Sequence, residues 1–154
     1  MPRSPGMEIN GLPAHPLLVH LVVVLLPLSA AGGILVSTWP AAQRKLGLLV
    51  PLGAVVGMLA VPLTTRAGRD LARHFGNPPF IAQHQNYGNQ VLPWAIALAA
   101  TTTLQWLVLR RPRTTTSRAL RAALGLAVVV SAVGTVVIVV LTGDSGARAV
   151  WGSR

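Results

Sequence analysis

The four histidines and three carboxylates of this chain are the side chains that could bind a metal or transfer protons. His15 and His20 stand at the start of a long apolar run, "HPLLVHLVVVLLPLSAAGGILV", and His84 precedes a later apolar run. Imidazole is a standard axial ligand of haem iron and a common ligand of zinc. Cysteine is absent, which excludes disulfides and thiolate metal sites.

Our leading hypothesis is a b-type haem between the first and third helices, with His20 and His84 as the ligands of its iron. His15 is a further candidate for contact with the cofactor. Cofactor sites in helical bundles are built from inward side chains on facing helices, and a neutral imidazole costs less to bury than a charged ligand. The alternative is cofactor-free: each histidine then hydrogen-bonds a neighbouring group and ties helices together.

A metal ion bound without haem is a second site hypothesis. His15 and His20 are five residues apart, which is about 140° around a helix, so one regular helix would not direct both to the same ion. If His15 precedes the helix, this objection weakens, and Asp70, His84 or Asp144 could complete a zinc or copper site. No compact ligand spacing supports such a site.

The segment "GDSG", residues 143–146, is similar to the glycine-flanked nucleophilic serine of some proteases. Catalysis would require a base within hydrogen-bond reach of Ser145 and a third group to orient that base. The same residue types are also common in turns that follow a helix. We therefore expect no stand-alone enzyme, and a redox carrier at most.

Composition indicates the elements that must position these residues. The chain is 52% hydrophobic and 10% charged, whereas soluble domains carry about 25% charged residues. Four apolar blocks, residues 16–36, 46–61, 91–109 and 119–141, approach the ~20 residues that cross a bilayer as a helix. We predict an all-α, antiparallel four-helix bundle in the membrane at residues 13–142. Residues 1–12 and 143–154 would be tails, and no internal repeat is evident.

Local signals set the expected helix ends. Pro16 suits the first position of a helix, which would leave His15 just outside it. The polar stretch 64–80 suggests a short interfacial helix between the second and third spans. The third helix can start after Pro79, before its apolar run, and Gly143 and Gly146 suggest the end of the fourth helix.

Glycines in the second block indicate close helix packing. Gly53 and Gly57 form a GxxxG pair, which lets another helix approach within the chain or from a second copy. A homo-oligomer is therefore compatible with the sequence.

The charge distribution predicts the orientation in the membrane. The net charge is +10, and the dense basic segment 110–121, "RRPRTTTSRALR", is typical of a short cytoplasmic loop. With four spans, both termini are then extracytoplasmic. We expect the arginines to contact the lipid bilayer and not nucleic acid.

Three segments carry a family resemblance: "GLPAHPLLVHLVVVLLPLSAA", "AQHQNYGN" and "TGDSGARAVWG". The chain resembles, from about Gly11 to Gly152, the bacterial four-helix membrane family catalogued as domain of unknown function 2231. The resemblance implies a bacterial cytoplasmic membrane protein with His15, Pro16, His20 and His84 as characteristic positions. Some members are fused to Rieske-type electron-transfer domains, which implies redox membrane proteins as partners.

Overall fold

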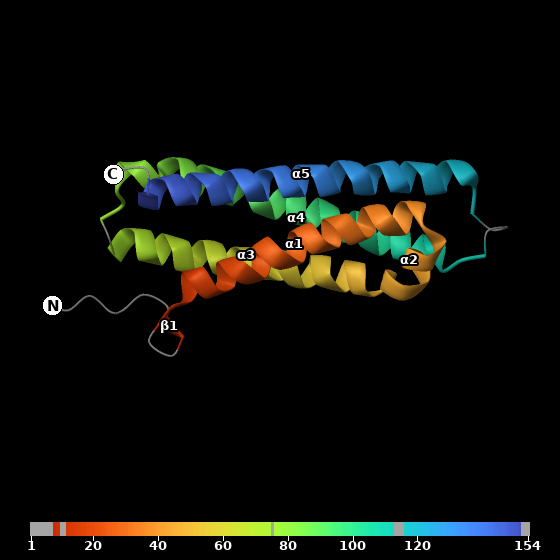
Figure 1. The fold of residues 1–154 in the computed structure, drawn as a ribbon, viewed down its shortest axis with the longest axis horizontal. Coiled ribbons are helices and arrows are strands. Elements are labelled where there is room, and N and C mark those ends of the chain that lie inside the picture. The colour runs from red at the N-terminus through yellow and green to blue at the C-terminus, as the bar shows by residue number, and fades with distance from the viewer. Residues whose placement is uncertain (1–7, 10–11, 75, 113–115, 152–154) are drawn as a thin grey trace.

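Four long helices lie side by side in the computed structural model, which describes all residues except 1–7, 10–11, 75, 113–115 and 152–154 (Figure 1). They are α1 (Ala14–Thr38), α3 (Leu49–His74), α4 (Ala82–Leu109) and α5 (Arg118–Trp151). Each is long and apolar enough to cross a membrane. The predicted four-helix membrane bundle is thus confirmed. The shorter elements are β1 (Glu8–Ile9), β2 (Leu12–Pro13), α2 (Pro40–Leu46) and the 3-10 helix η1 (Pro79–Ile81).

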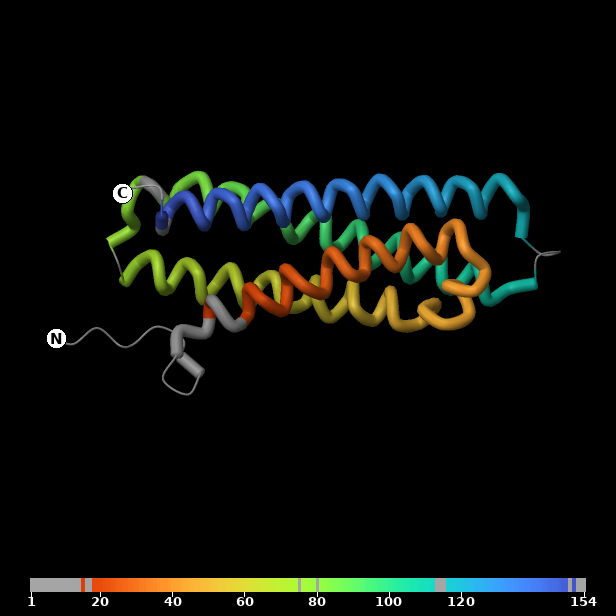
Figure 2. The backbone as a smooth tube through the Cα atoms, viewed as in Figure 1, coloured from red at the N-terminus to blue at the C-terminus, as the bar shows by residue number. Residues whose placement is uncertain are grey.

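The bundle consists of two helical hairpins. In the first hairpin α1 packs on α3, and in the second hairpin α4 packs on α5. Across the hairpins α1 contacts α5 and α3 contacts α4, whereas α1 and α4 lie on a diagonal and hardly touch. Figure 2 shows α1 running obliquely across the bundle while α5 spans its length.

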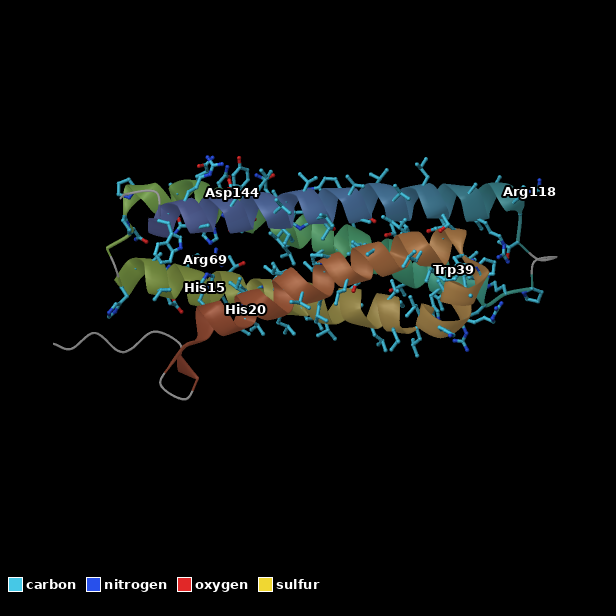
Figure 3. All side chains as sticks on the ribbon, in the orientation of Figure 1. His15, His20, Trp39, Arg69, Arg118 and Asp144 are labelled. Carbon is cyan, nitrogen blue, oxygen red and sulfur yellow. The ribbon has the colours of Figure 1, made fainter. Side chains whose placement is uncertain are left out.

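The two ends of the bundle differ in their side chains. At the histidine end, α1 and α4 begin and α3 and α5 finish; at the arginine end, α1 and α4 finish and α5 begins. Figure 3 labels His15, Arg69 and Asp144 near the histidine end, and Trp39 and Arg118 near the arginine end.

Apolar side chains fill the bundle and also cover its outside. Leu26, Leu98 and Val128 are fully buried, while Leu28 and Leu126 are 64% and 66% exposed. Exposed leucines in the middle of a helix are costly in water and favourable in lipid, as a spanning bundle requires. Buried hydroxyls bond to the preceding turn, for example from Thr102 Oγ1 to the Leu98 carbonyl at 2.7 Å, so they are satisfied in the core.

The GxxxG pair joins the two helices of the first hairpin. A Cβ on Gly53 would lie 2.6 Å from Ser29 Oγ, and one on Gly57 would lie 2.7 Å from Leu26 Cδ2. A side chain at either position would force its neighbour on α1 to shift, so the glycines allow α1 to approach α3 closely within the chain.

Two helices begin near their predicted positions. The third span, α4, starts at Ala82 directly after η1, which confirms a helix start before its apolar run. The first span starts at Ala14 and not at Pro16, so His15 lies in the first turn of α1. Proline is tolerated there because the N–H it lacks would have no partner in the first turn.

Two helices extend further than the sequence indicated. The polar stretch from Thr64 to His74 continues α3 instead of forming a separate interfacial helix, and the chain leaves the helix at Gly76 and Asn77, whose φ angles are +79° and +51°. The expectation that Gly143 and Gly146 end the fourth helix is wrong, because α5 continues through both to Trp151. Glycine inside a helix costs only about 1 kcal/mol, which packing can offset.

Candidate functional site

The structure brings His15 and His84 together at the histidine end. His15 lies in the first turn of α1, and His84 lies in the first turn of α4. Their ring centroids are 6.4 Å apart, and the ring planes are nearly perpendicular at 85°. Because α1 and α4 stand on a diagonal of the bundle, the two imidazoles come from different hairpins and meet between them.

Each imidazole is oriented by a backbone carbonyl of its own hairpin. His15 Nδ1 lies 3.0 Å from the Thr64 carbonyl oxygen on α3, and His84 Nδ1 lies 2.9 Å from the Thr142 carbonyl oxygen on α5. A carbonyl only accepts, so each Nδ1 carries a proton and donates it; in the neutral tautomer with this arrangement Nε2 holds the lone pair. Proteins orient metal-ligating histidines in the same way, through the nitrogen that does not bind the metal.

A glycine lies against each ring. A Cβ on Gly68 would lie 2.8 Å from His15 Cε1, and a Cβ on Gly146 would lie 3.1 Å from His84 Cε1. Each glycine follows the threonine that supplies the carbonyl by four residues, so carbonyl and glycine sit one turn apart on the same helix face. A Cβ would overlap the ring of His15 at Gly68 and would crowd the ring of His84 at Gly146, so both glycines give the rings room beside the carbonyls.

The two hairpins therefore contain the same local arrangement, a histidine held on a Thr-x-x-x-Gly segment. Sequence reasoning missed both segments, Thr64–Gly68 and Thr142–Gly146, and found no repeat. The available signal was their identical spacing, each in the apolar span that follows the span with the histidine at its start. The signal is short, and its meaning depends on which helices pair.

Burial affects the protonation of His15, which lies outside the apolar span that begins at Leu18. Burial lowers the pKa of His15, the bond to the Thr64 carbonyl opposes this, and the nearby His84 adds to the lowering. At neutral pH the ring is thus uncharged, the form that binds a metal. Within the described part of the chain, Nε2 of neither ring has a hydrogen-bond partner.

His20 occupies a different position from the one the haem hypothesis gave it. Its side chain is exposed, and the ring contact of His84 is with His15. The reason is helical phase: five residues turn about 140°, so a helix that directs His15 inward turns His20 toward the outside. Ligation by His20 stays a prediction.

The carboxylates of the second site hypothesis are engaged elsewhere. Asp70 lies 3.4 Å from Arg73, and Asp144 lies 2.9 Å from Arg148, in exposed ion pairs. In the residues that the structure describes, no group of three or more His, Cys, Asp and Glu could hold a metal ion. The two histidines are therefore a pair without a third protein ligand of these types in that region.

Ser145 is buried and bonds within its own helix. Its hydroxyl donates to the Thr142 carbonyl at 2.9 Å, the same carbonyl that receives His84 Nδ1. No hydrogen bond joins Ser145 to a histidine in the described ranges, so the serine–base contact of a hydrolase is not assembled there.

Comparison with known families agrees with the architecture. A family model described as "Predicted membrane protein (DUF2231)" matches residues 11–154, a range that includes both histidines of the pair and both Thr-x-x-x-Gly segments. No curated protein and no solved structure matches the chain. The chain belongs to the DUF2231 family of predicted membrane proteins.

Proposed function

We propose that the protein is an electron-transfer protein of the bacterial cytoplasmic membrane, which binds a b-type haem between His15 and His84. The observation that carries this proposal is the pair itself: two imidazoles from different hairpins, each oriented through Nδ1, with ring centroids 6.4 Å apart. This assignment replaces His20 by His15 in the ligand pair suggested by the sequence.

The separation of the rings supports one ion between them. A metal–nitrogen bond is about 2.0–2.1 Å, so two imidazoles on opposite sides of one ion have ring centres roughly 6.3 Å apart. Two directly hydrogen-bonded imidazoles would have closer ring centres. The spacing of His15 and His84 therefore suits a shared metal better than a direct contact.

The number of donors favours haem over a bare ion. A structural zinc site takes four ligands, and the described residues contain no group of three or more His, Cys, Asp and Glu that could hold a metal. Haem iron needs only two axial ligands from the protein, because the porphyrin fills the other positions. When bound, the haem would supply one-electron redox chemistry.

The surroundings of the pair also suit a haem. A Cβ on Gly88, one turn along α4 from His84, would meet only the Thr142 methyl group at 4.0 Å, so this flank is not crowded. Arg66 and Arg69 flank Gly68 in the sequence, have exposed side chains and form none of the ion pairs within the described residues. Their guanidinium groups could pair with the haem propionates.

The orientation follows from the charges. The segments around Arg44 and Arg110 to Arg121 lie at the arginine end and carry no acidic residue, as cytoplasmic loops do. The histidine end is then extracytoplasmic, where a redox partner would exchange electrons with the haem.

A cofactor-free role has one observation in its favour. The bond from His15 to the Thr64 carbonyl joins α1 to α3, and the bond from His84 to the Thr142 carbonyl joins α4 to α5. Two such bonds would stabilise the hairpins without any ligand, by roughly 1 kcal/mol each.

Haem titration distinguishes the two roles. The purified protein in detergent should bind one haem per chain with a sharp Soret band, and His15→Ala and His84→Ala should each lose it. His20→Ala is the matched control, since its ring lies on the same helix and is exposed. A wild-type protein that binds no haem would refute the proposal, and loss of haem in His20→Ala alone would refute the ligand assignment.

A further inference from the structure

A second candidate site lies at the arginine end, far from the histidines (Figure 3). A pocket of about 410 Å³ opens where α1 and α4 finish and α5 begins. We call it the arginine pocket. Its polar lining consists of Ser37, Gln43, Gln105, Thr116, Arg118 and Arg121.

The charge of the arginine pocket is positive and uncompensated by the chain. Two guanidinium groups line it, and the lining contains no carboxylate. The three acidic residues of the sequence are Glu8, Asp70 and Asp144, which belong to β1 and to the helix ends at the histidine end. The pocket therefore suits an anion.

Arg121 supplies a specific reason for a ligand. Its Nη2 donates to the Arg111 carbonyl at 3.3 Å, but its Nε is buried and has no hydrogen-bond partner among the described residues. A buried donor without an acceptor is costly, and an anionic oxygen in the pocket would remove that cost.

The neutral wall of the arginine pocket is held in place by its own hydrogen bonds. Gln105 Nε2 donates to Ser37 Oγ at 2.6 Å, and Ser37 Oγ donates to the Gly33 carbonyl at 2.9 Å. Gln43 Nε2 donates to the Val36 carbonyl at 3.0 Å. These bonds fix the positions of the neutral side chains, and the two guanidinium groups are the charged donors that remain for a ligand.

The surroundings place the arginine pocket at the lipid–water interface. Val108, Leu109 and Leu124 line it beside the polar groups. At the same end Trp39 is 58% exposed, and Arg110 stacks over the Trp106 ring at 4.6 Å. Tryptophan and arginine are typical of membrane interfaces. A ligand here would have both a charged and an apolar part.

We propose that the arginine pocket binds the phosphodiester headgroup of an anionic phospholipid, with Arg118 and Arg121 on the phosphate oxygens. Planar guanidinium groups donate two parallel hydrogen bonds to phosphate, and basic pockets between spanning helices bind such headgroups. The apolar wall accommodates the start of an acyl chain. The site is independent of haem binding at the other end.

Lipid binding by the full chain tests this proposal. Native mass spectrometry in detergent should show one saturable molecule of phosphatidylglycerol and no equally tight binding of phosphatidylcholine. Arg118→Gln with Arg121→Gln should weaken phosphatidylglycerol binding by roughly tenfold or more, since charge-assisted bonds are lost. Arg73→Gln, a change at an exposed arginine of the histidine end that has no role in the haem site, is the control for charge and should bind the lipid like the wild type.

Three results would overturn the proposal. They are equal binding of the two lipids, unchanged binding in the double variant, and displacement of the lipid by millimolar inorganic phosphate, which would indicate a site for free phosphate. If the double variant does not fold, Arg118→Gln alone decides, because Arg118 is exposed at the first position of α5 and supports no core contact.

Discussion

The first hairpin holds His15 on α3 and the second hairpin holds His84 on α5, and the two differ in what surrounds the ring. In α1 the chain becomes apolar directly after Pro16, whereas α4 keeps polar residues as far as Gln90. Burial accordingly lowers the pKa of His15, the ring next to the apolar segment. In both hairpins a threonine carbonyl accepts the bond from Nδ1, and a glycine one turn later lies against the ring.

This comparison indicates which features the site requires. The residues between threonine and glycine differ, with Ala67 before Gly68 and Ser145 before Gly146. Both hairpins keep the backbone carbonyl of the threonine and the absence of a side chain at the glycine. The backbone of the neighbouring helix therefore sets the position of each ring, and changes at the two glycines should matter most.

Substitution of the glycines should have the largest effect on stability. Gly68→Leu and Gly146→Leu would each force a side chain into the space of an imidazole, and we expect a loss of about 1–3 kcal/mol in the free energy of unfolding. Gly68→Ala should cost more than Gly146→Ala, because its Cβ would lie closer to the ring. Unfolding of detergent-solubilised protein, followed by circular dichroism, measures these differences.

Gly143→Ala is the matched control on α5. A Cβ there would meet nothing within 4 Å, so only helix propensity changes, and stability should rise by up to about 1 kcal/mol. Equal responses at positions 68, 143 and 146 would contradict the role given to the two glycines.

Acidification should have the next largest effect on stability, and this effect distinguishes the two hairpins. The pKa of His15 is lower in the folded protein than its ordinary value of 6.5, so below that pH the unfolded chain binds more protons. The haem-free protein should lose stability as the pH falls from about 6.5 toward the folded pKa, by at most ~1.4 kcal/mol per pH unit for one group. Denaturant unfolding between pH 7.5 and 5 measures this slope.

His15→Gln should reduce that pH dependence more than His84→Gln does. The titratable group that acts on His15 is His84 on α4, which the first variant leaves in place. A slope that survives His15→Gln unchanged would show that another group titrates.

Ser145→Ala should have the smallest effect. The change makes the second hairpin resemble the first, where Ala67 occupies the corresponding position. Only one bond to the Thr142 carbonyl is lost, and that carbonyl still receives His84 Nδ1, so we expect a loss of about 0.5–1.5 kcal/mol. Haem affinity should remain within about threefold of wild type, a change of under 1 kcal/mol. A complete loss of haem in this variant would mean that the serine itself is part of the site.

The sequence predicts the spans well because their signal is local. Twenty apolar residues in a row cross a bilayer whatever their neighbours are, and the early start of α4 follows from Pro79. The histidine pair was less predictable because it depends on helical phase. Which of His15 and His20 faces inward depends on how α1 is rotated against the neighbouring helices, and no residue near Pro16 settles that rotation.

The glycines and the arginine pocket show a second limit of prediction from the sequence. Whether Gly146 ends a helix or makes room for a ring depends on His84, which is 62 residues away in the sequence and belongs to another helix. The arginine pocket likewise joins side chains from α1, α2, α4 and α5. Such information exists only once the helices are paired.

Low-temperature electron paramagnetic resonance of the ferric haem complex is the most direct test of two imidazoles on one iron. Wild-type protein and His20→Ala should both give the low-spin spectrum of bis-imidazole ligation, and His15→Met and His84→Met should each change it to that of mixed ligation. A high-spin spectrum in the wild type, or a low-spin spectrum that neither methionine variant alters, would contradict the account.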